Sequence, residues 1–137
     1  YIDQKTKLVF SEKELIKIFG KEPLYKFSIN QKDNWEEYLN LITRKYLVQT
    51  SKLGLVPLGK INDDWMKNLY EEFKKLINPK NIICDRNLFK SSECDVIFII
   101  TQKGVNKRAE LRNFIKKLEI QGNKTVEWFI LDNENSL

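Results

Sequence analysis

The first fifty residues alternate between amphipathic helical segments and extended ones. Ser11, with Glu14 three residues later, has the capping-box spacing that begins a helix. Residues 24–29 alternate apolar and polar side chains, which is typical of a half-buried strand. Asp33 is expected to cap the next helix, whose apolar stripe consists of Trp35, Tyr38, Leu39, Ile42 and Tyr46. A helix with such a stripe needs a surface to cover, so residues 1–50 are predicted to be an N-terminal, mainly helical extension packed on the rest of the chain.

From about residue 51 the pattern changes to regularly alternating strands and helices. Strands are expected over 53–59, 81–84, 94–101 and 124–126, and helices over 63–77 and 106–121. The segment 94–101 is almost continuously apolar, as in a strand that helices cover on both faces. Residues 127–131 are expected to begin a final helix. Short connections between these elements predict an α/β fold over residues 51–137, with a small four-stranded parallel sheet flanked by helices.

The composition narrows the chemistry that such a domain could perform. The chain has 137 residues, 42% of them hydrophobic and 31% charged, which is typical of one globular domain. It contains no histidine, and this excludes Ser-His-Asp and Cys-His catalysis as well as histidine-ligated metal sites. Its formal net charge of +5 is compatible with an acidic partner. We therefore expect a binding function without a cofactor, and not an enzyme.

The two cysteines and the ends of the chain bear on its location. Cys84 and Cys94 both lie beside apolar runs, so they are interpreted as buried thiols in a reducing compartment. No apolar run approaches the roughly 20 residues that span a bilayer, and no secretory signal is visible. Because the chain begins at Tyr1 and not at methionine, we expect it to be a fragment of a longer protein.

Three motifs of the second region resemble the BRCT family of interaction domains. Residues 55–59 (Leu-Val-Pro-Leu-Gly) are similar to the family's first strand and the glycine that follows it. Residues 94–99 resemble its apolar third strand, which the basic pair Lys107-Arg108 follows. Residues 125–129 contain Trp128 at the place where the family packs a tryptophan into its core. Trp35 and Trp65, which lie on apolar helix stripes, are also expected to be core residues.

This resemblance implies a nuclear adaptor that recognises an acidic or phosphorylated peptide of another nuclear protein in DNA repair or chromatin silencing. It implies that the partners include neither a membrane nor a small-molecule substrate. The phosphate-binding members of the family carry serine or threonine before the glycine of the first turn, where this chain has Leu58. The Asn78-Pro79-Lys80 turn also replaces the family's Gly-Gly pair.

Basic residues near two turns are the candidate ligand contacts. The peptide or phosphate site is predicted to consist of Gly59, Lys60, Lys103, Lys107, Arg108 and Arg112. Lys107 and Arg108 fall in the first turn of a helix, where free backbone N–H groups and the helix dipole favour an anion. Arginine can also hold a phosphate through two parallel hydrogen bonds. The alternative interpretation is a solvated basic helix face, formed by Arg108, Arg112, Lys116 and Lys117.

Two other functions remain open from the sequence. The basic charge is compatible with direct nucleic-acid binding, although lysine and glutamate alternate too closely to form a long stripe of one sign. A metal-dependent nuclease is the third choice, because such an enzyme needs clustered carboxylates. The carboxylates that could serve it are Asp63, Asp64, Asp85, Asp95 and Glu110.

Overall fold

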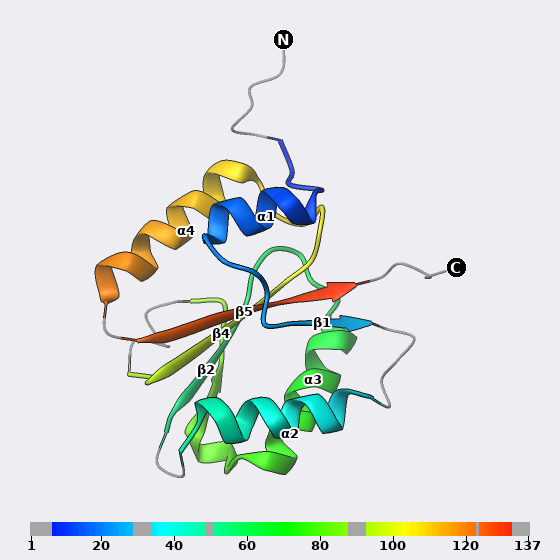
Figure 1. The fold of residues 1–137 in the computed structure, drawn as a ribbon, viewed down its shortest axis with the longest axis vertical. Coiled ribbons are helices and arrows are strands. Elements are labelled where there is room, and N and C mark those ends of the chain that lie inside the picture. The colour runs from blue at the N-terminus through cyan, green and yellow to red at the C-terminus, as the bar shows by residue number, and fades with distance from the viewer. Residues whose placement is uncertain (1–6, 29–33, 49–50, 88–92, 123, 133–137) are drawn as a thin grey trace.

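A computed structural model describes residues 7–28, 34–48, 51–87, 93–122 and 124–132. These residues form five strands, four α-helices and one short 3₁₀ helix (Figure 1). In chain order the elements are α1 (Glu12–Phe19), β1 (Tyr25–Ser28), α2 (Trp35–Tyr46), β2 (Leu53–Pro57), α3 (Asp63–Leu76), η3 (Pro79–Asn81), β3 (Ile82–Cys84), β4 (Val96–Thr101), α4 (Arg108–Gln121) and β5 (Thr125–Asp132).

The strands form a single parallel sheet in the order β1-β5-β4-β2-β3. The α/β class and the flanking helices agree with the sequence prediction, but the sheet has five strands where four were expected. The additional strand is β1, which pairs in parallel with β5 from Tyr25↔Phe129 to Ser28↔Asp132. The sequence did predict a strand near residues 24–29, and the fold places it at the edge of the common sheet.

The end of the chain differs from the prediction. Residues 125–132 form one continuous strand, so the final helix expected from residue 127 onward is wrong, and α4 is the last helix among the described residues. Trp128 and Ile130 face one side of the sheet, whereas Phe129 and Leu131 face the other. A run that is apolar on both faces suits β5 because the strand lies between β4 and β1 and is covered on both sides.

Helices cover both faces of the sheet and bury two separate apolar layers (Figure 1). On one face α2 and α3 contribute Trp35, Leu39, Trp65 and Phe73, among others, to a cluster with Phe98 and Phe129 of the sheet. On the other face α1 and α4 contribute Leu15 and Leu111 to a cluster with Ile97, Ile99 and Trp128. Trp35, Trp65 and Trp128 are all buried, as the sequence predicted.

The helices begin where side-chain caps are available. Ser11 caps α1 by accepting a hydrogen bond from the Glu14 N–H at 3.3 Å, which confirms half of the expected capping box. Asn62 caps α3 by accepting from the N–H groups of Asp64 and Trp65. Asp33, the expected cap of the second helix, lies outside the described residues.

The two cysteines occupy different environments. Cys94 is buried as expected, but Cys84 is exposed, so the prediction of two buried thiols is wrong for Cys84. Cys84 is the last residue of β3, and β3 is an edge strand that pairs only with β2 among the described strands. Desolvation raises the pKa of both thiols above the usual value, which reduces their thiolate fraction at neutral pH.

We expect thiol titration to distinguish these two residues. A thiol reagent at pH 8 should modify one cysteine of the native protein rapidly and the second only after unfolding, because reagents reach exposed thiols first. Cys84→Ser should remove the rapid phase, and Cys94→Ser should keep it. Two equally fast phases in the native protein would contradict the buried position of Cys94.

Candidate functional site

The six predicted contact residues do not form one site. Lys107, Arg108 and Arg112 lie at the start of α4, whereas Gly59 and Lys60 lie in the β2–α3 loop. Lys103 lies between β4 and α4 and lines neither the hollow beside α4 nor the one beside this loop. The structure therefore separates the predicted set into a helix group and a loop group, and each has its own surroundings.

The segment before α1 covers the start of α4. Leu8 forms an antiparallel bridge with Lys107, and the Val9 N–H donates to the Asn106 carbonyl at 2.9 Å. The N–H of Arg108, the first residue of α4, donates to the Lys7 carbonyl at 3.0 Å. This backbone donor, which the sequence assigned to an anion, is thus already used within the chain.

Arg108 also has a partner for its side chain. Its guanidinium forms an ion pair with Glu14 of α1, and the Arg108 side chain is only 20% exposed. Reversing the charge of Arg108 would place two carboxylates together, so that variant would test folding as much as binding. Arg108 therefore joins α1 to α4, and its neighbours are better probes of ligand binding.

A groove between α1 and α4 is lined by four basic side chains. Its volume is about 500 Å³, and it is lined by Ser11, Lys13, Glu14, Lys17, Ile18, Arg108 and Arg112. Four cations thus face one carboxylate, and that carboxylate is paired with Arg108. We call these seven residues the basic groove. Its excess of positive charge in one concavity favours an anionic ligand.

Sequence reasoning missed two members of the basic groove. Lys13 and Lys17 are four residues apart on α1, so they share one face of that helix. The i, i+4 spacing was a usable signal, but only the packing of α1 beside α4 brings this face to Arg112. Lys13, Lys17 and Arg112 are all exposed, whereas Lys107 contributes to the N-terminal bridge and does not line the groove.

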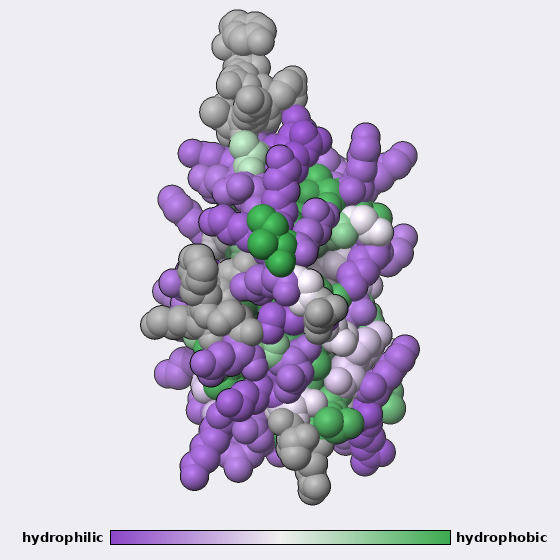
Figure 2. All heavy atoms as spheres, turned by 90° about the vertical axis from the view of Figure 1, so that its left-hand side faces the viewer, coloured by the Kyte–Doolittle hydropathy of each residue, from purple (hydrophilic) through white to green (hydrophobic). Residues whose placement is uncertain are grey.

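The face seen from the α4 side is predominantly hydrophilic (Figure 2). Polar side chains cover most of it, and the hydrophobic groups are scattered between them. On α3 the charges of opposite sign are paired locally, with Lys74–Glu71 at 2.8 Å and Lys75–Glu72 at 3.0 Å. These ion pairs offset two of the α3 lysines, whereas the basic groove has four cations around one carboxylate.

Gly59 has a packing role that its backbone conformation explains. Its φ is +87°, in the left-handed region that favours glycine. A Cβ atom here would lie 2.6 Å from the Val105 carbonyl oxygen and 2.8 Å from Asn106 Oδ1. The preceding Leu58 packs its side chain against the apolar cluster beneath α1 and α4. Leu58 thus contributes to the core.

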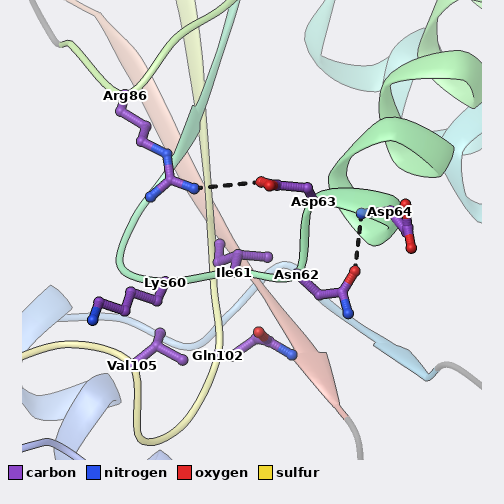
Figure 3. Close-up of a pocket in the computed structure, with 8 residues that line it drawn as sticks. All are labelled: Lys60, Ile61, Asn62, Asp63, Asp64, Arg86, Gln102 and Val105. Carbon is purple, nitrogen blue, oxygen red and sulfur yellow. Dashed lines mark hydrogen bonds and ion pairs between the residues drawn. The ribbon is translucent and has the colours of Figure 1, made fainter.

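Lys60 lines a second hollow, which we call the edge cleft. It lies at the carboxyl ends of β2, β3 and β4 and is lined by Lys60, Ile61, Asn62, Asp63, Asp64, Arg86, Gln102 and Val105 (Figure 3). Arg86 donates to the Gly59 carbonyl at 2.7 Å, and its other terminal nitrogen lies 3.8 Å from Asp63. Two cations and two carboxylates line this cleft, so its formal charge is balanced, in contrast to the basic groove.

The carboxylates that could serve a nuclease lie at different ends of the sheet. Asp63 and Asp64 begin α3 at the carboxyl edge. Asp95 precedes β4 and accepts a hydrogen bond from the Lys52 N–H at 3.1 Å, at the opposite edge. Within the described ranges, no group of three or more His, Cys, Asp or Glu side chains is placed to hold a metal ion.

Comparison with known proteins gives no relative: no family model, curated protein or solved structure matches this chain. In the described part of the chain, no helix has the length and apolar character required to cross a membrane. The basic groove and the edge cleft are therefore the two candidate sites, and their geometry and charge indicate what they can bind.

Proposed function

We propose that this chain is a non-catalytic, BRCT-like interaction module that binds an acidic or phosphorylated peptide of a nuclear protein in the basic groove. The observation that carries the proposal is the grouping of Lys13, Lys17, Arg108 and Arg112 around one concavity that holds a single carboxylate. Hydrogen bonds between such cations and phosphate or carboxylate groups are about twice as strong as neutral ones.

The arrangement of elements supports the family resemblance. The segment from β2 to β5 runs strand, helix, strand, strand, helix, strand, which is the order inferred from the sequence. Because Leu58 stands where the phosphate-binding members of the family have serine or threonine, we place the proposed phosphate contact in the basic groove and not at the Gly59 turn. In the basic groove, α1 of the N-terminal extension supplies two of the cations, so we propose that the extension is part of the ligand site.

The same geometry favours a peptide over a long nucleic acid. The groove is short, with a volume of about 500 Å³, and Ile18 offers an apolar contact beside the charges. A nucleic-acid surface would extend positive charge over several phosphates, whereas Lys74 and Lys75 of α3 are paired with Glu71 and Glu72. Binding to DNA or RNA is the competing outcome of the peptide-binding test.

Peptide binding can be tested with arrayed acidic and phosphorylated peptides, followed by fluorescence anisotropy on the best ligand. Lys13→Glu/Lys17→Glu and Arg112→Glu should each weaken binding by at least about tenfold, because each replaces attraction by repulsion in the groove. Lys116→Glu/Lys117→Glu, on the same helix as Arg112 but outside the groove lining, is the matched control and should retain affinity.

Two results would contradict the proposal. One is a peptide affinity that is unchanged in both groove variants while their circular dichroism and melting temperature stay native. The other is tighter binding to DNA or RNA than to any peptide, with a steep loss as salt increases, since that dependence reports release of counterions from phosphates.

A further inference from the structure

The edge cleft lies where an open parallel sheet most often binds a ligand. From β2 the chain passes through α3 to β3 on one side, and from β4 it passes through α4 to β5 on the other side (Figure 1). The boundary between the adjacent strands β2 and β4 is therefore the point where the strand order reverses. In open α/β sheets, ligands bind in the crevice outside the carboxyl ends of the strands at such a point.

The strongest sign of a ligand is a buried polar side chain without a partner. Gln102 follows β4, is only 6% exposed and lines the cleft. Its carboxamide forms no hydrogen bond with any described residue. The carboxamide is not among the fully enclosed unpaired polar atoms of the described residues, so it opens onto the cleft and is accessible to a ligand. The Gln102 carboxamide offers both a donor and an acceptor to a molecule in the cleft.

The charged groups of the cleft are arranged on two sides. Figure 3 shows Lys60 and Arg86 on one side and Asp63 and Asp64 on the other, with Ile61 and Gln102 between them. Val105 adds a second apolar side chain to the lining. A complementary ligand has an anionic group at one end, hydrogen-bond donors at the other, and a part between them that can contact both apolar carbon and an amide.

The size of the cleft distinguishes among such ligands. Its volume is about 820 Å³, within the range of roughly 300–1,000 Å³ that holds molecules of drug size. A single ion or amino acid would leave most of this space to water. A nucleotide with an amino-substituted base has a phosphate, a planar ring with hydrogen-bonding edges, and an exocyclic amino donor.

We propose that the edge cleft is a nucleotide site. The phosphate binds on the side of Lys60 and Arg86, the base lies against Ile61 and Val105 with an edge on Gln102, and its amino group faces the carboxylates of Asp63 and Asp64. Glutamine amides pair well with adenine edges, and carboxylates accept hydrogen bonds from amino groups of bases. This site goes beyond the proposed peptide function and departs from the expectation that no small molecule binds.

The direct test is isothermal titration calorimetry with AMP, IMP, adenosine and inorganic phosphate. AMP should bind at least about fivefold more tightly than IMP, because IMP replaces the amino donor by a carbonyl that faces carboxylates. Adenosine and inorganic phosphate should each bind more weakly than AMP, since each lacks one end of the ligand. No detectable binding at about 1 mM AMP, or equal affinities for AMP and IMP, would overturn the proposal.

Variants then assign the contacts. Gln102→Leu and Lys60→Ala should each weaken AMP binding by about fivefold to tenfold, and Asp64→Asn should reduce the preference for AMP over IMP. Lys116→Ala, outside the cleft lining, is the control and should bind like wild type. The groove variant Lys13→Glu/Lys17→Glu should also keep AMP affinity, which separates this site from the peptide groove. AMP affinity unchanged in folded Gln102→Leu would overturn the assignment.

Discussion

Trp128→Ala is expected to lower the free energy of unfolding by about 3–5 kcal/mol, the largest loss that we predict for any single substitution in this chain. Trp128 is fully buried in the central part of β5, and its ring stacks on Phe19 of α1 with centroids 4.3 Å apart. Its indole N–H donates to the Lys21 carbonyl at 2.9 Å. Truncation would leave a cavity beneath α1 and an unpaired carbonyl, and urea unfolding followed by circular dichroism measures the loss.

A more conservative variant separates these contributions. Trp128→Phe keeps an aromatic ring against Phe19 but removes the hydrogen bond to Lys21, so it should lose about 1–3 kcal/mol, less than the alanine variant. A loss below about 1 kcal/mol for Trp128→Ala would show that the indole is not enclosed between α1 and the sheet. It would also remove the main support for the packing of α1 on the sheet.

Gly59→Ala is expected to destabilise the fold by about 2–4 kcal/mol. The φ of +87° is unfavourable for alanine, and the new methyl group would approach the Val105 carbonyl oxygen within 2.6 Å. Real Cβ atoms do not come so close to a backbone oxygen, so the β2–α3 loop or the β4–α4 loop would have to move. Because both loops line the edge cleft, displacement of either should also weaken any ligand that binds there.

Gly20→Ala provides the matched control for this prediction. Gly20 ends α1 with a φ of +79°, yet no atom lies within 4 Å of the position its Cβ would take. This variant should therefore show only the backbone penalty of about 1–2 kcal/mol. Equal losses for Gly20→Ala and Gly59→Ala in urea unfolding would contradict the tight contact between the two loops.

The strength of the local patterns explains which elements the sequence predicted. Ser11 and Asn62 stand directly before apolar helix stripes, and both act as caps. Residues 94–101 are apolar over almost every position, and Val96–Thr101 is fully buried in the sheet. The prediction for the last strand is wrong from residue 127 onward because a short apolar run such as 128–131 suits a buried strand or a buried helix equally well, and only its partners on both sides decide.

The candidate site was less predictable because its parts are distant in the chain. Arg108 and Arg112 were identified from their place on a basic helix, and both line the groove. The pairing of Arg108 with Glu14 could not be inferred, since 94 positions separate the two residues in sequence. Gln102 gave no signal at all, because a glutamine after a strand is ordinary until its burial without a partner is seen.

Sequence patterns alone predicted the α/β class, the positions of most helices and strands, the burial of the three tryptophans and the excess of basic charge. These properties depend on periodicity and composition, which are visible in residues that lie close together in the sequence. The tertiary structure decided that residues 25–28 become a fifth strand, that α1 lies beside α4 to complete the basic groove, and that Cys84 is exposed. Such features arise from contacts between distant segments, whose free energies depend on shape and charge complementarity and have no counterpart in local pattern.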